Sequence, residues 1–250
     1  MRGNRVKQKL RAGEIANLLS GHSISSDSID FCGQLGFDGF WIEGEHGSVT
    51  WDQIGDMSRA CDLWDMTSAM RVYSHEPGVI TRALDRGVNG IVVPHVNTKA
   101  QAEQIVKATC FAPIGQRGMF SGGRRGYSDP NYIQNANDDV LLVILIEEVE
   151  AIHNLAEIIN VDHIDVFFVA PSDLAQSMGL IGQPYHPEVQ AVIQRAIQQI
   201  TAAGRVAGTI GMEAVLETHI QSGARFFMTN YDAWIKTGAS QYLAKVAALQ

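Results

Sequence analysis

The sequence predicts an α/β protein that folds as a single (β/α)8 TIM barrel over residues 1–250. Two observations predict this class. Short runs rich in β-branched residues alternate with longer segments of helical spacing, which is the pattern of parallel βα units. Several of these runs, among them LLVILI and VFFV, are apolar at consecutive positions, as strands are when both faces are covered. A chain of 250 residues that is 46% hydrophobic has the length and the apolar content for one such barrel.

About eight such runs follow one another at even spacing, which favours a closed barrel over a doubly wound sheet. No G-x-G-x-x-G or P-loop motif accompanies them, so the sequence gives nucleotide binding little support. In chain order, the predicted strands are Ile15–Ser20, Gly39–Glu43, Thr67–Val72, Gly90–Pro94, Leu141–Glu147, Ile164–Val169, Val206–Ile210 and Phe226–Thr229.

Helical spacing fills the intervals between these strands, and several of the helical segments end in a glycine suited to a helix C-cap. The segment Ile114–Asp139 is too long for an ordinary connection, so we expect it to carry a short helix and part of the active-site rim. The predicted helices are Glu76–Arg86, Lys99–Cys110, Ile152–Ile159, Pro187–Ala203 and Glu213–Gln221.

The charge balance disfavours nucleic acid and anionic membranes as partners, because the formal net charge is −8. A small-molecule ligand fits this balance better. One basic cluster runs against it, formed by Arg117, Arg124 and Arg125 in RGMFSGGRRG. This cluster could bind a carboxylate or a phosphate, or it could be a solvated glycine-rich loop.

The cysteines and the first residues of the chain favour a cytoplasmic protein. Cys32, Cys61 and Cys110 are odd in number and have no metal-ligand spacing, so we expect three core thiols in a reducing compartment. The apolar stretch Ile15–Leu19 is too short for a signal sequence or a membrane span.

Polar residues that directly follow the predicted strands are the candidates for chemistry, because the active site of a parallel barrel lies at the carboxyl ends of its strands. FWIEGEHGS places Glu43, Glu45 and His46 after the second strand, and SAMRVYS places Arg71 at the end of the third. Arg71 has an alternative as a simple ion-pair partner.

Two further carboxylates follow later strands, Glu147 after LLVILI and Asp173 in FFVAPSDLA. A carboxylate that ends an apolar run would be desolvated without a partner, which favours a functional role for Glu147. Asp173 could instead be only the N-cap of a helix that starts at Leu174. Together the two carboxylates, a ligand's own oxygens and water would suit the octahedral coordination of Mg²⁺ or Mn²⁺. An arginine and a histidine at the same mouth would add a fixed positive charge and a base, which are the requirements of enolate chemistry.

The motifs GEH, MR, IEE and VAPSDLA, in this order over residues 16–238, closely resemble the HpcH/HpaI aldolases. These class II pyruvate-dependent aldolases cleave 4-hydroxy-2-oxo acids, such as 4-hydroxy-2-oxoheptanedioate and 2-dehydro-3-deoxyglucarate. The resemblance implies a TIM barrel of the phosphoenolpyruvate/pyruvate type. It also implies a homo-oligomer, a hexamer built as a trimer of dimers.

The resemblance implies a role for each matching residue. Glu147 and Asp173 would bind a divalent metal ion (Mg²⁺, Mn²⁺ or Co²⁺) that pyruvate chelates. Arg71 would stabilise the enolate. His46 would take the proton from the C4 hydroxyl, and Asp85 in RALDRG would orient His46 and raise its basicity. The turn formed by Ala170, Pro171 and Ser172, at a helix N-terminus, would hold the pyruvate carboxylate.

The chain departs from the family pattern at several positions of the expected site. Leu145 stands where the family has a glutamine, Glu43 where it has an aspartate, and Ala170 where it has a glycine. His75 and His95 lie near the mouth and fit loop residues better than metal ligands. The other histidines fit a surface position: His22, His153, His163, His186 and His219.

Two other functions remain open from the sequence. One is a malyl- or citramalyl-CoA-type lyase, which would need an extended basic path for the nucleotide phosphates. The other is a barrel that binds a keto acid without turning it over, an alternative that the changes at Leu145 and Ala170 keep open.

Overall fold

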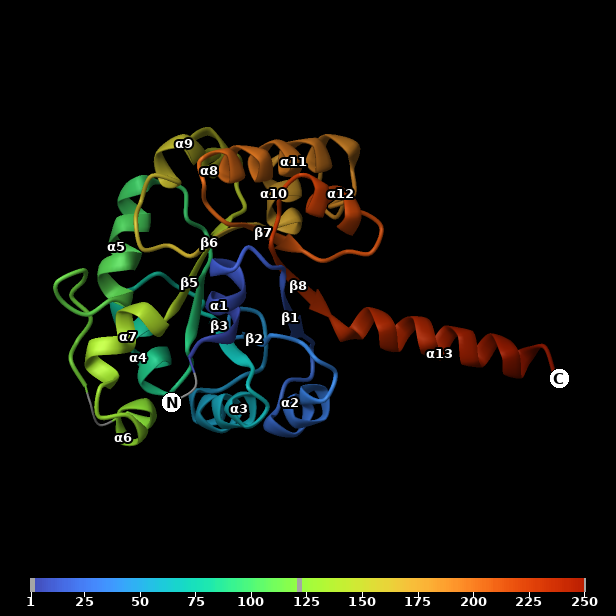
Figure 1. The fold of residues 1–250 in the computed structure, drawn as a ribbon. Coiled ribbons are helices and arrows are strands. Elements are labelled where there is room, and N and C mark those ends of the chain that lie inside the picture. The colour runs from blue at the N-terminus through green and yellow to red at the C-terminus, as the bar shows by residue number, and fades with distance from the viewer. Residues whose placement is uncertain (1–2, 121–122, 250) are drawn as a thin grey trace.

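The computed structural model describes residues 3–120 and 123–249. Met1, Arg2 and Gln250, at the ends of the predicted domain, and Ser121 and Gly122, within the RGMFSGGRRG segment, lie outside the described residues. Eight parallel strands form a closed barrel in sequential order, with helices around it (Figure 1). The predicted fold class is therefore confirmed.

All eight predicted strands are present, and their bounds agree with the prediction to within two residues. β1 pairs with β8 from Ala16 opposite Phe226 to Ser20 opposite Asn230, which closes the barrel. The strands are β1 (Ala16–Ser20), β2 (Gly39–Glu43), β3 (Thr67–Arg71), β4 (Gly90–Val93), β5 (Leu141–Ile146), β6 (Val166–Val169), β7 (Ala207–Ile210) and β8 (Phe226–Asn230).

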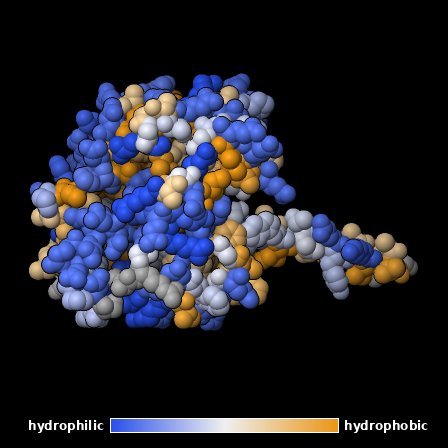
Figure 2. All heavy atoms as spheres, viewed as in Figure 1, coloured by the Kyte–Doolittle hydropathy of each residue, from blue (hydrophilic) through white to orange (hydrophobic). Residues whose placement is uncertain are grey.

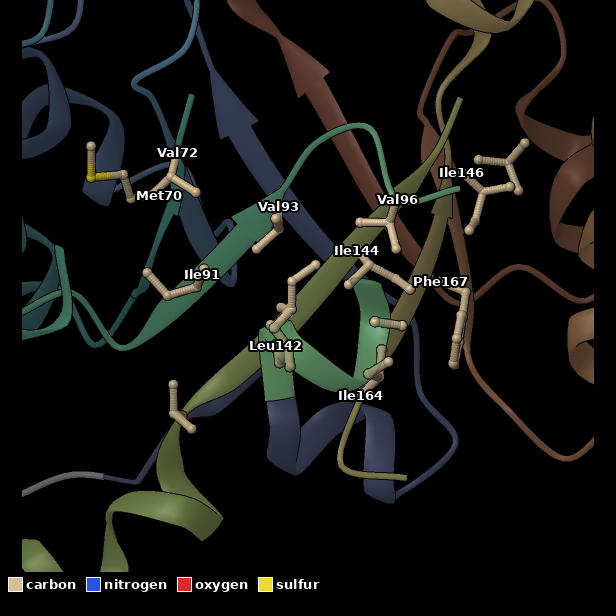
Figure 3. Packing of buried hydrophobic residues seen from close by; sticks show 14 of the residues in the cluster. Met70, Val72, Ile91, Val93, Val96, Leu142, Ile144, Ile146, Ile164 and Phe167 are labelled. Atoms are coloured by element: carbon tan, nitrogen blue, oxygen red, sulfur yellow. The ribbon is translucent and has the colours of Figure 1, made fainter. Parts of the chain in front are cut away.

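The consecutive apolar residues of the strands form two hydrophobic layers. One fills the barrel interior, where Trp41, Leu145 and Phe168 are buried together. The other lies between the strands and the helices, and Figure 3 shows Ile144 of β5 and Phe167 of β6 in it. Both faces of each strand are thus covered, which is why the sequence lacks the alternation of a half-exposed sheet.

The helices that join consecutive strands run back along the outside of the barrel, as parallel strands require. The predicted helix Ile152–Ile159 is wrong as a single element, because Asn154, with φ −91° and ψ 3°, separates two short helices. The predicted start at Glu213 is too early, because the helix begins at Leu216. The helices are α1 (Arg5–Arg11), α2 (Ser26–Gly33), α3 (Trp51–Leu63), α4 (Pro77–Asp85), α5 (Lys99–Thr109), α6 (Arg124–Ser128), α7 (Tyr132–Asp139), α8 (Val149–His153), α9 (Leu155–Ile158), α10 (Pro171–Ser177), α11 (Pro187–Ala202), α12 (Leu216–Gln221) and α13 (Tyr231–Ala247).

The long segment between α5 and β5 carries helices, as expected, but it does not form the rim of this barrel's mouth. It joins the end of a helix to the start of a strand, so it lies at the amino ends of the strands, opposite the carboxyl ends where a barrel's active site forms. Its contacts agree: Arg125 Nε donates to the carbonyl of Gly87, just before β4, at 2.7 Å.

The basic residues of this segment are not a solvated loop. Arg117 and Arg125 are buried. Arg117 Nη2 lies 2.7 Å from Asp85 Oδ1, and both Arg124 and Arg125 form ion pairs with Asp62. Burial of a guanidinium requires such partners, because a desolvated charge without one is costly.

α13 projects away from the barrel (Figure 1), and none of its 17 residues is buried. It nevertheless carries large apolar side chains that are exposed, and Figure 2 shows hydrophobic residues along it. They are Trp234, Ile235, Tyr242, Leu243 and Val246. Within residues 3–120 and 123–249, no helix has both the length and the apolarity to cross a membrane.

Two smaller predictions have opposite outcomes. The three cysteines are free and buried, as expected of core thiols. The surface position predicted for His219 is wrong, because this residue is completely buried and its Nε2 lies 3.1 Å from Gln190 Oε1. Burial lowers the pKa of the His219 imidazole, so it is neutral and serves as a core polar residue.

Candidate active site at the carboxyl ends of the strands

The barrel mouth gathers polar side chains from the carboxyl ends of β2, β3, β5 and β6. Glu43 and Arg71 are the last residues of β2 and β3, and their backbones are paired in register. Glu147 follows β5 directly, and Asp173 lies in α10, directly after β6. All four therefore stand at the edge of the barrel where active sites form.

Arg71 is held between two glutamates. Its Nε and Nη2 each lie 2.8 Å from Glu43 Oε2, and its Nη1 lies 3.0 Å from Glu45 Oε2. Burial alone would raise the pKa of Glu43, but the charge and hydrogen bonds of Arg71 outweigh it and the net pKa is lowered. Arg71 is thus an ion-pair partner, as the simpler interpretation expected, and it is also fixed in orientation at the mouth.

His46 lies in the loop after β2 with an exposed side chain. Its backbone N–H donates to Glu43 Oε1 at 3.0 Å, and its Nε2 lies 3.8 Å from Glu45 Oε2. Within the chain, the carboxylate next to His46 is therefore Glu45, which the sequence placed among the candidate residues without a specific role.

Asp85 lies elsewhere. It is the last residue of α4, which runs back toward the amino ends of the strands, and it contacts Arg117. The chain does not bring Asp85 and His46 together, because one lies at each end of the barrel.

Glu147 is the most deeply buried acid of the mouth, with 1% of its surface exposed. Its Oε1 accepts a hydrogen bond from the His95 backbone N–H at 2.7 Å, whereas its Oε2 has no hydrogen-bond partner among the described residues. The net pKa of Glu147 is raised from an ordinary 4.5 to about 7, mainly by burial and also by the charge of Asp173, against the opposing effects of His95 and Arg71. A buried carboxylate oxygen without a partner requires an explanation, and a cation is the simplest one.

Asp173 is the third residue of α10, and Ala170 is the N-cap, so the interpretation of Asp173 as the N-cap of a helix starting at Leu174 is wrong. Ala170 and Pro171 are buried at the start of this helix, and Ser172 is exposed. The turn expected for a carboxylate therefore has the predicted place at a helix N-terminus.

The mouth fits a divalent cation that a substrate helps to coordinate. Among the described residues, no group of three or more histidine, cysteine, aspartate or glutamate side chains forms a metal cluster. Two carboxylates, Glu147 and Asp173, would leave coordination positions for substrate oxygens and water, as Mg²⁺ and Mn²⁺ sites do. The unpartnered Oε2 of Glu147 is the observation that supports this fit.

His95 belongs to this cluster although its sequence suggested an ordinary loop residue. It does lie in the loop after β4, but its Nδ1 is 2.9 Å from Glu148 Oε1 and its Nε2 is 3.6 Å from Glu45 Oε1. Burial lowers the pKa of the imidazole, but the surrounding carboxylates, Glu147 first, outweigh it and the net pKa is raised. The signal in the sequence was its place, directly after the fourth strand, the same signal that identified Glu147.

A second concave region lies outside the barrel, between α3, α4 and the segment after α5. We call it the arginine cavity, and its volume is about 690 Å³. Five arginines and two aspartates line it, so its charge is opposite to that of the mouth. These residues are Arg59, Arg82, Arg86, Arg117, Arg124, Asp52 and Asp85.

Fold and mouth together define an (β/α)8 barrel with an acidic, arginine-containing site at the carboxyl ends of its strands. The family model described as HpcH/HpaI aldolase/citrate lyase matches residues 21–233, and the chain belongs to this family. The resemblance seen in the sequence is thereby confirmed.

Individual relatives agree with this assignment. The 4-hydroxy-2-oxo-heptane-1,7-dioate aldolase of Salmonella heidelberg (strain SL476) is 34% identical over 96% of this chain and 93% of its own length. An HpcH/HpaI aldolase/citrate lyase family protein from Burkholderia cenocepacia J2315 superimposes with a TM-score of 0.91 at 27% identity, covering 98% of this chain and 99% of its own. The citrate synthase SbnG shares the fold with a TM-score of 0.86 at 22% identity, covering 98% of each chain.

Proposed function

We propose that this protein is a class II, divalent-metal-dependent pyruvate aldolase, a carbon–carbon lyase with one catalytic barrel domain over residues 1–250. It reversibly cleaves a 4-hydroxy-2-oxo acid to pyruvate and an aldehyde, in the cytoplasm. The observation that carries the proposal is the buried Glu147. Its Oε2 has no hydrogen-bond partner among the described residues, and the charges of Asp173 and Arg71 both act on its pKa.

Glu147 and Asp173 would hold the cation, which is Mg²⁺, Mn²⁺ or Co²⁺. When bound, the cation supplies positive charge beside the carboxylate and keto oxygens of pyruvate. At the start of α10, the backbone N–H of Ser172 would donate to the same carboxylate, because Pro171 has no N–H and the Ala170 N–H already donates to the carbonyl of Ile146.

The chain's own residues then account for the proton and the charge. His46 accepts the proton of the C4 hydroxyl, and the C3–C4 bond breaks to release the aldehyde. The electron pair of that bond forms the enolate of pyruvate, whose oxygen faces the guanidinium of Arg71. Because Glu43 and Glu45 already fix Arg71, its charge needs little reorganisation as the enolate forms.

The role of Asp85 requires a second copy of the chain. Asp85 lines the arginine cavity, at the far end of the barrel from His46. The mouth is rich in carboxylates and the cavity in arginines, so the two surfaces have complementary charge. In a homo-oligomer in which the cavity of one copy meets the mouth of another, Asp85 would reach the partner's site and orient its base.

α13 supplies a second reason for an oligomer. It is about 25 Å long at 1.5 Å per residue, and its apolar side chains are exposed. Phe31 and Leu35, at and just after the end of α2, are also exposed and apolar. Packing of α13 on another copy would bury these surfaces, and the hexamer implied by the family resemblance would bring copies of the chain together. The mass measured by light scattering should fall for Leu243→Glu but not for the control Lys236→Glu. An unchanged mass for Leu243→Glu would remove this support.

A mixing experiment tests the shared site. His46→Ala and Asp85→Ala chains should each have little activity, whereas co-refolded mixtures should regain up to about a quarter of the wild-type activity, because a site with both residues intact forms by chance. If the mixtures are no more active than the separate variants, either both residues belong to the site of one chain or Asp85 takes no part in the site. Both results would exclude the shared site.

The two alternatives receive less support. A CoA-dependent lyase needs an extended basic path for the nucleotide phosphates, but Arg117, Arg124 and Arg125 are each ion-paired with an aspartate. A silent keto-acid binder needs a defective site. Leu145 is part of the fully buried interior layer, so its replacement of a polar residue affects one contact and leaves Glu147, Asp173 and Arg71 in place.

Release of pyruvate tests the proposal directly. The protein, treated with EDTA and then supplied with Mg²⁺, Mn²⁺ or Co²⁺, should release pyruvate from a panel of 4-hydroxy-2-oxo acids in an assay coupled to lactate dehydrogenase. Pyruvate release should require the restored metal. A protein that binds metal and pyruvate but releases none from any member of the panel would be a binder and not an aldolase.

A further inference from the structure

The turn after β4 has an unusual backbone at His95. Its φ is 56°, in the left-handed region that residues with a Cβ disfavour. Among the described residues, Asp65 and His163 are the other non-glycine residues with positive φ, and neither follows the carboxyl end of a strand. Strain of this kind at a barrel mouth points to a function.

The turn directs two consecutive backbone N–H groups toward β5. The N–H of His95 donates to Glu147 Oε1 at 2.7 Å, and the N–H of Val96 donates to the carbonyl of Leu145 at 3.3 Å. Consecutive N–H groups of an extended strand point in opposite directions, so both can face β5 only if the chain turns sharply between them. The left-handed conformation of His95 provides that turn.

The imidazole of His95 has its shortest contact with another acid. Its Nδ1 lies 2.9 Å from Glu148 Oε1 and 3.5 Å from Glu147 Oε1, and the other oxygen of Glu148 accepts a hydrogen bond from Asn97 Nδ2 at 2.9 Å. Both oxygens of Glu148 are therefore engaged, whereas Glu147 Oε2 has no hydrogen-bond partner among the described residues.

We propose that His95 is a positioning residue for the metal-binding carboxylate of Glu147, and that it acts through its backbone. Its left-handed turn holds the N–H against Glu147 Oε1, so that Oε2 stays directed at the cation. This inference rests on the proposed function, because it assumes that Glu147 binds the metal.

Two substitutions that remove the same imidazole separate the backbone from the side chain. His95→Gly keeps the N–H and tolerates the left-handed conformation, whereas His95→Val keeps the N–H but resists that conformation because it is β-branched. Titration calorimetry with Mn²⁺ should give a Kd for His95→Gly within about threefold of wild type and a Kd for His95→Val about tenfold weaker. His95→Asn, which also tolerates the conformation, should bind like His95→Gly.

His163 provides the matched control, because it is an exposed histidine with φ 65° away from the mouth. His163→Gly and His163→Val should differ in thermal stability as the His95 pair does, but both should bind Mn²⁺ like wild type. If His95→Val does not fold, His95→Ala replaces it, because its Cβ also disfavours the left-handed region.

The outcomes are distinct. Equal Mn²⁺ affinity in His95→Gly and His95→Val, or an equal loss in both, overturns the role of the backbone turn. Weaker binding in His163→Val as well would show that lost stability is the cause, and it also overturns the inference. A wild-type protein that binds no Mn²⁺ would overturn the proposed metal site itself, which is a separate result.

Discussion

The barrel mouth and the arginine cavity both contain arginine–carboxylate pairs, but they leave opposite groups unsatisfied. At the mouth, Arg71 is shared by Glu43 and Glu45, and Oε2 of Glu147 is a buried carboxylate oxygen without a hydrogen-bond partner among the described residues. In the cavity, the unpartnered atoms among the described residues are Nε of Arg117 and of Arg124. The mouth therefore has a carboxylate oxygen available for a cation, whereas the cavity has guanidinium N–H groups available for an anionic surface.

The difference shows that an ion pair alone does not identify an active site. The pair Arg125–Asp62 joins α6 to the end of α3 at the amino ends of the strands, where barrels keep residues that stabilise the fold. Arg71 makes equally short contacts, yet it stands beside a buried acid with a raised pKa. Position relative to the strand ends separates the two kinds of pair.

The largest effect is expected at Glu147. Glu147→Gln should abolish Mn²⁺ binding and lower kcat/KM by roughly a thousandfold or more, because a catalytic cation contributes several kcal/mol. The same change should stabilise the metal-free protein, because it removes a buried charge. Glu148→Gln is the matched control and should keep metal affinity within about threefold, since both oxygens of Glu148 bind protein groups. Equal metal affinity in wild type and Glu147→Gln would disprove the assignment of the site.

A smaller loss is expected at Arg71. Arg71→Lys should lower kcat by about a hundredfold, because lysine cannot reproduce the forked contacts that fix the charge beside the enolate. Its Mn²⁺ affinity should change little. Steady-state kinetics and calorimetry on the same preparation would check both expectations, and an unchanged kcat would return Arg71 to a purely structural role.

The pH dependence of metal affinity should be moderate, and it should be opposite in direction to the pH dependence of stability in the metal-free protein. Because the pKa of Glu147 is raised to about 7, a cation must displace a proton below that pH. The apparent metal affinity should rise by up to about tenfold per pH unit toward pH 7 and level off above it.

In the metal-free protein, stability should fall as the pH rises, whereas metal affinity rises. The raised pKa of Glu147 contributes stability that is fully present below the ordinary value of 4.5 and is lost as the pH rises through about 7. Melting temperatures in EDTA should therefore fall over this range more for wild type than for Glu147→Gln. Identical pH profiles for the two proteins would exclude Glu147 as the titrating group.

The smallest effect is expected at Arg125, the chain neighbour of Arg124 in the arginine cavity, and it should be on stability. Arg125→Lys should lower the free energy of unfolding by about 1–3 kcal/mol, because the buried guanidinium contacts the Gly87 carbonyl and Asp62. Denaturant unfolding would measure this change. A large fall in kcat without a loss of stability or of assembly would contradict the structural role of this pair.

Much of the site could be predicted from the strand ends alone. Glu43, Arg71 and Glu147 each end an apolar run, and in a parallel barrel that position is sufficient to place them at one mouth. Glu45 and His95 lie in the loops after β2 and β4, but their roles depend on contacts between these loops. The distance of 3.6 Å between His95 Nε2 and Glu45 Oε1 joins residues fifty positions apart, and no local pattern encodes it.

The sequence by itself determined the fold class, the eight strands, the family and the residues that line the mouth, because hydrophobic periodicity and strand ends are local properties of the chain. Tertiary structure decided which of two adjacent glutamates keeps an unpartnered oxygen, that His219 is buried, and that Asp85 and the arginines of the cavity lie away from the mouth. The physical reason is that pairing and burial depend on neighbours brought together by closure of the barrel. The length of a helix that follows a strand decides how far its last residue lies from the barrel mouth. Asp85 is the last residue of α4 and therefore lies at the opposite end of the barrel.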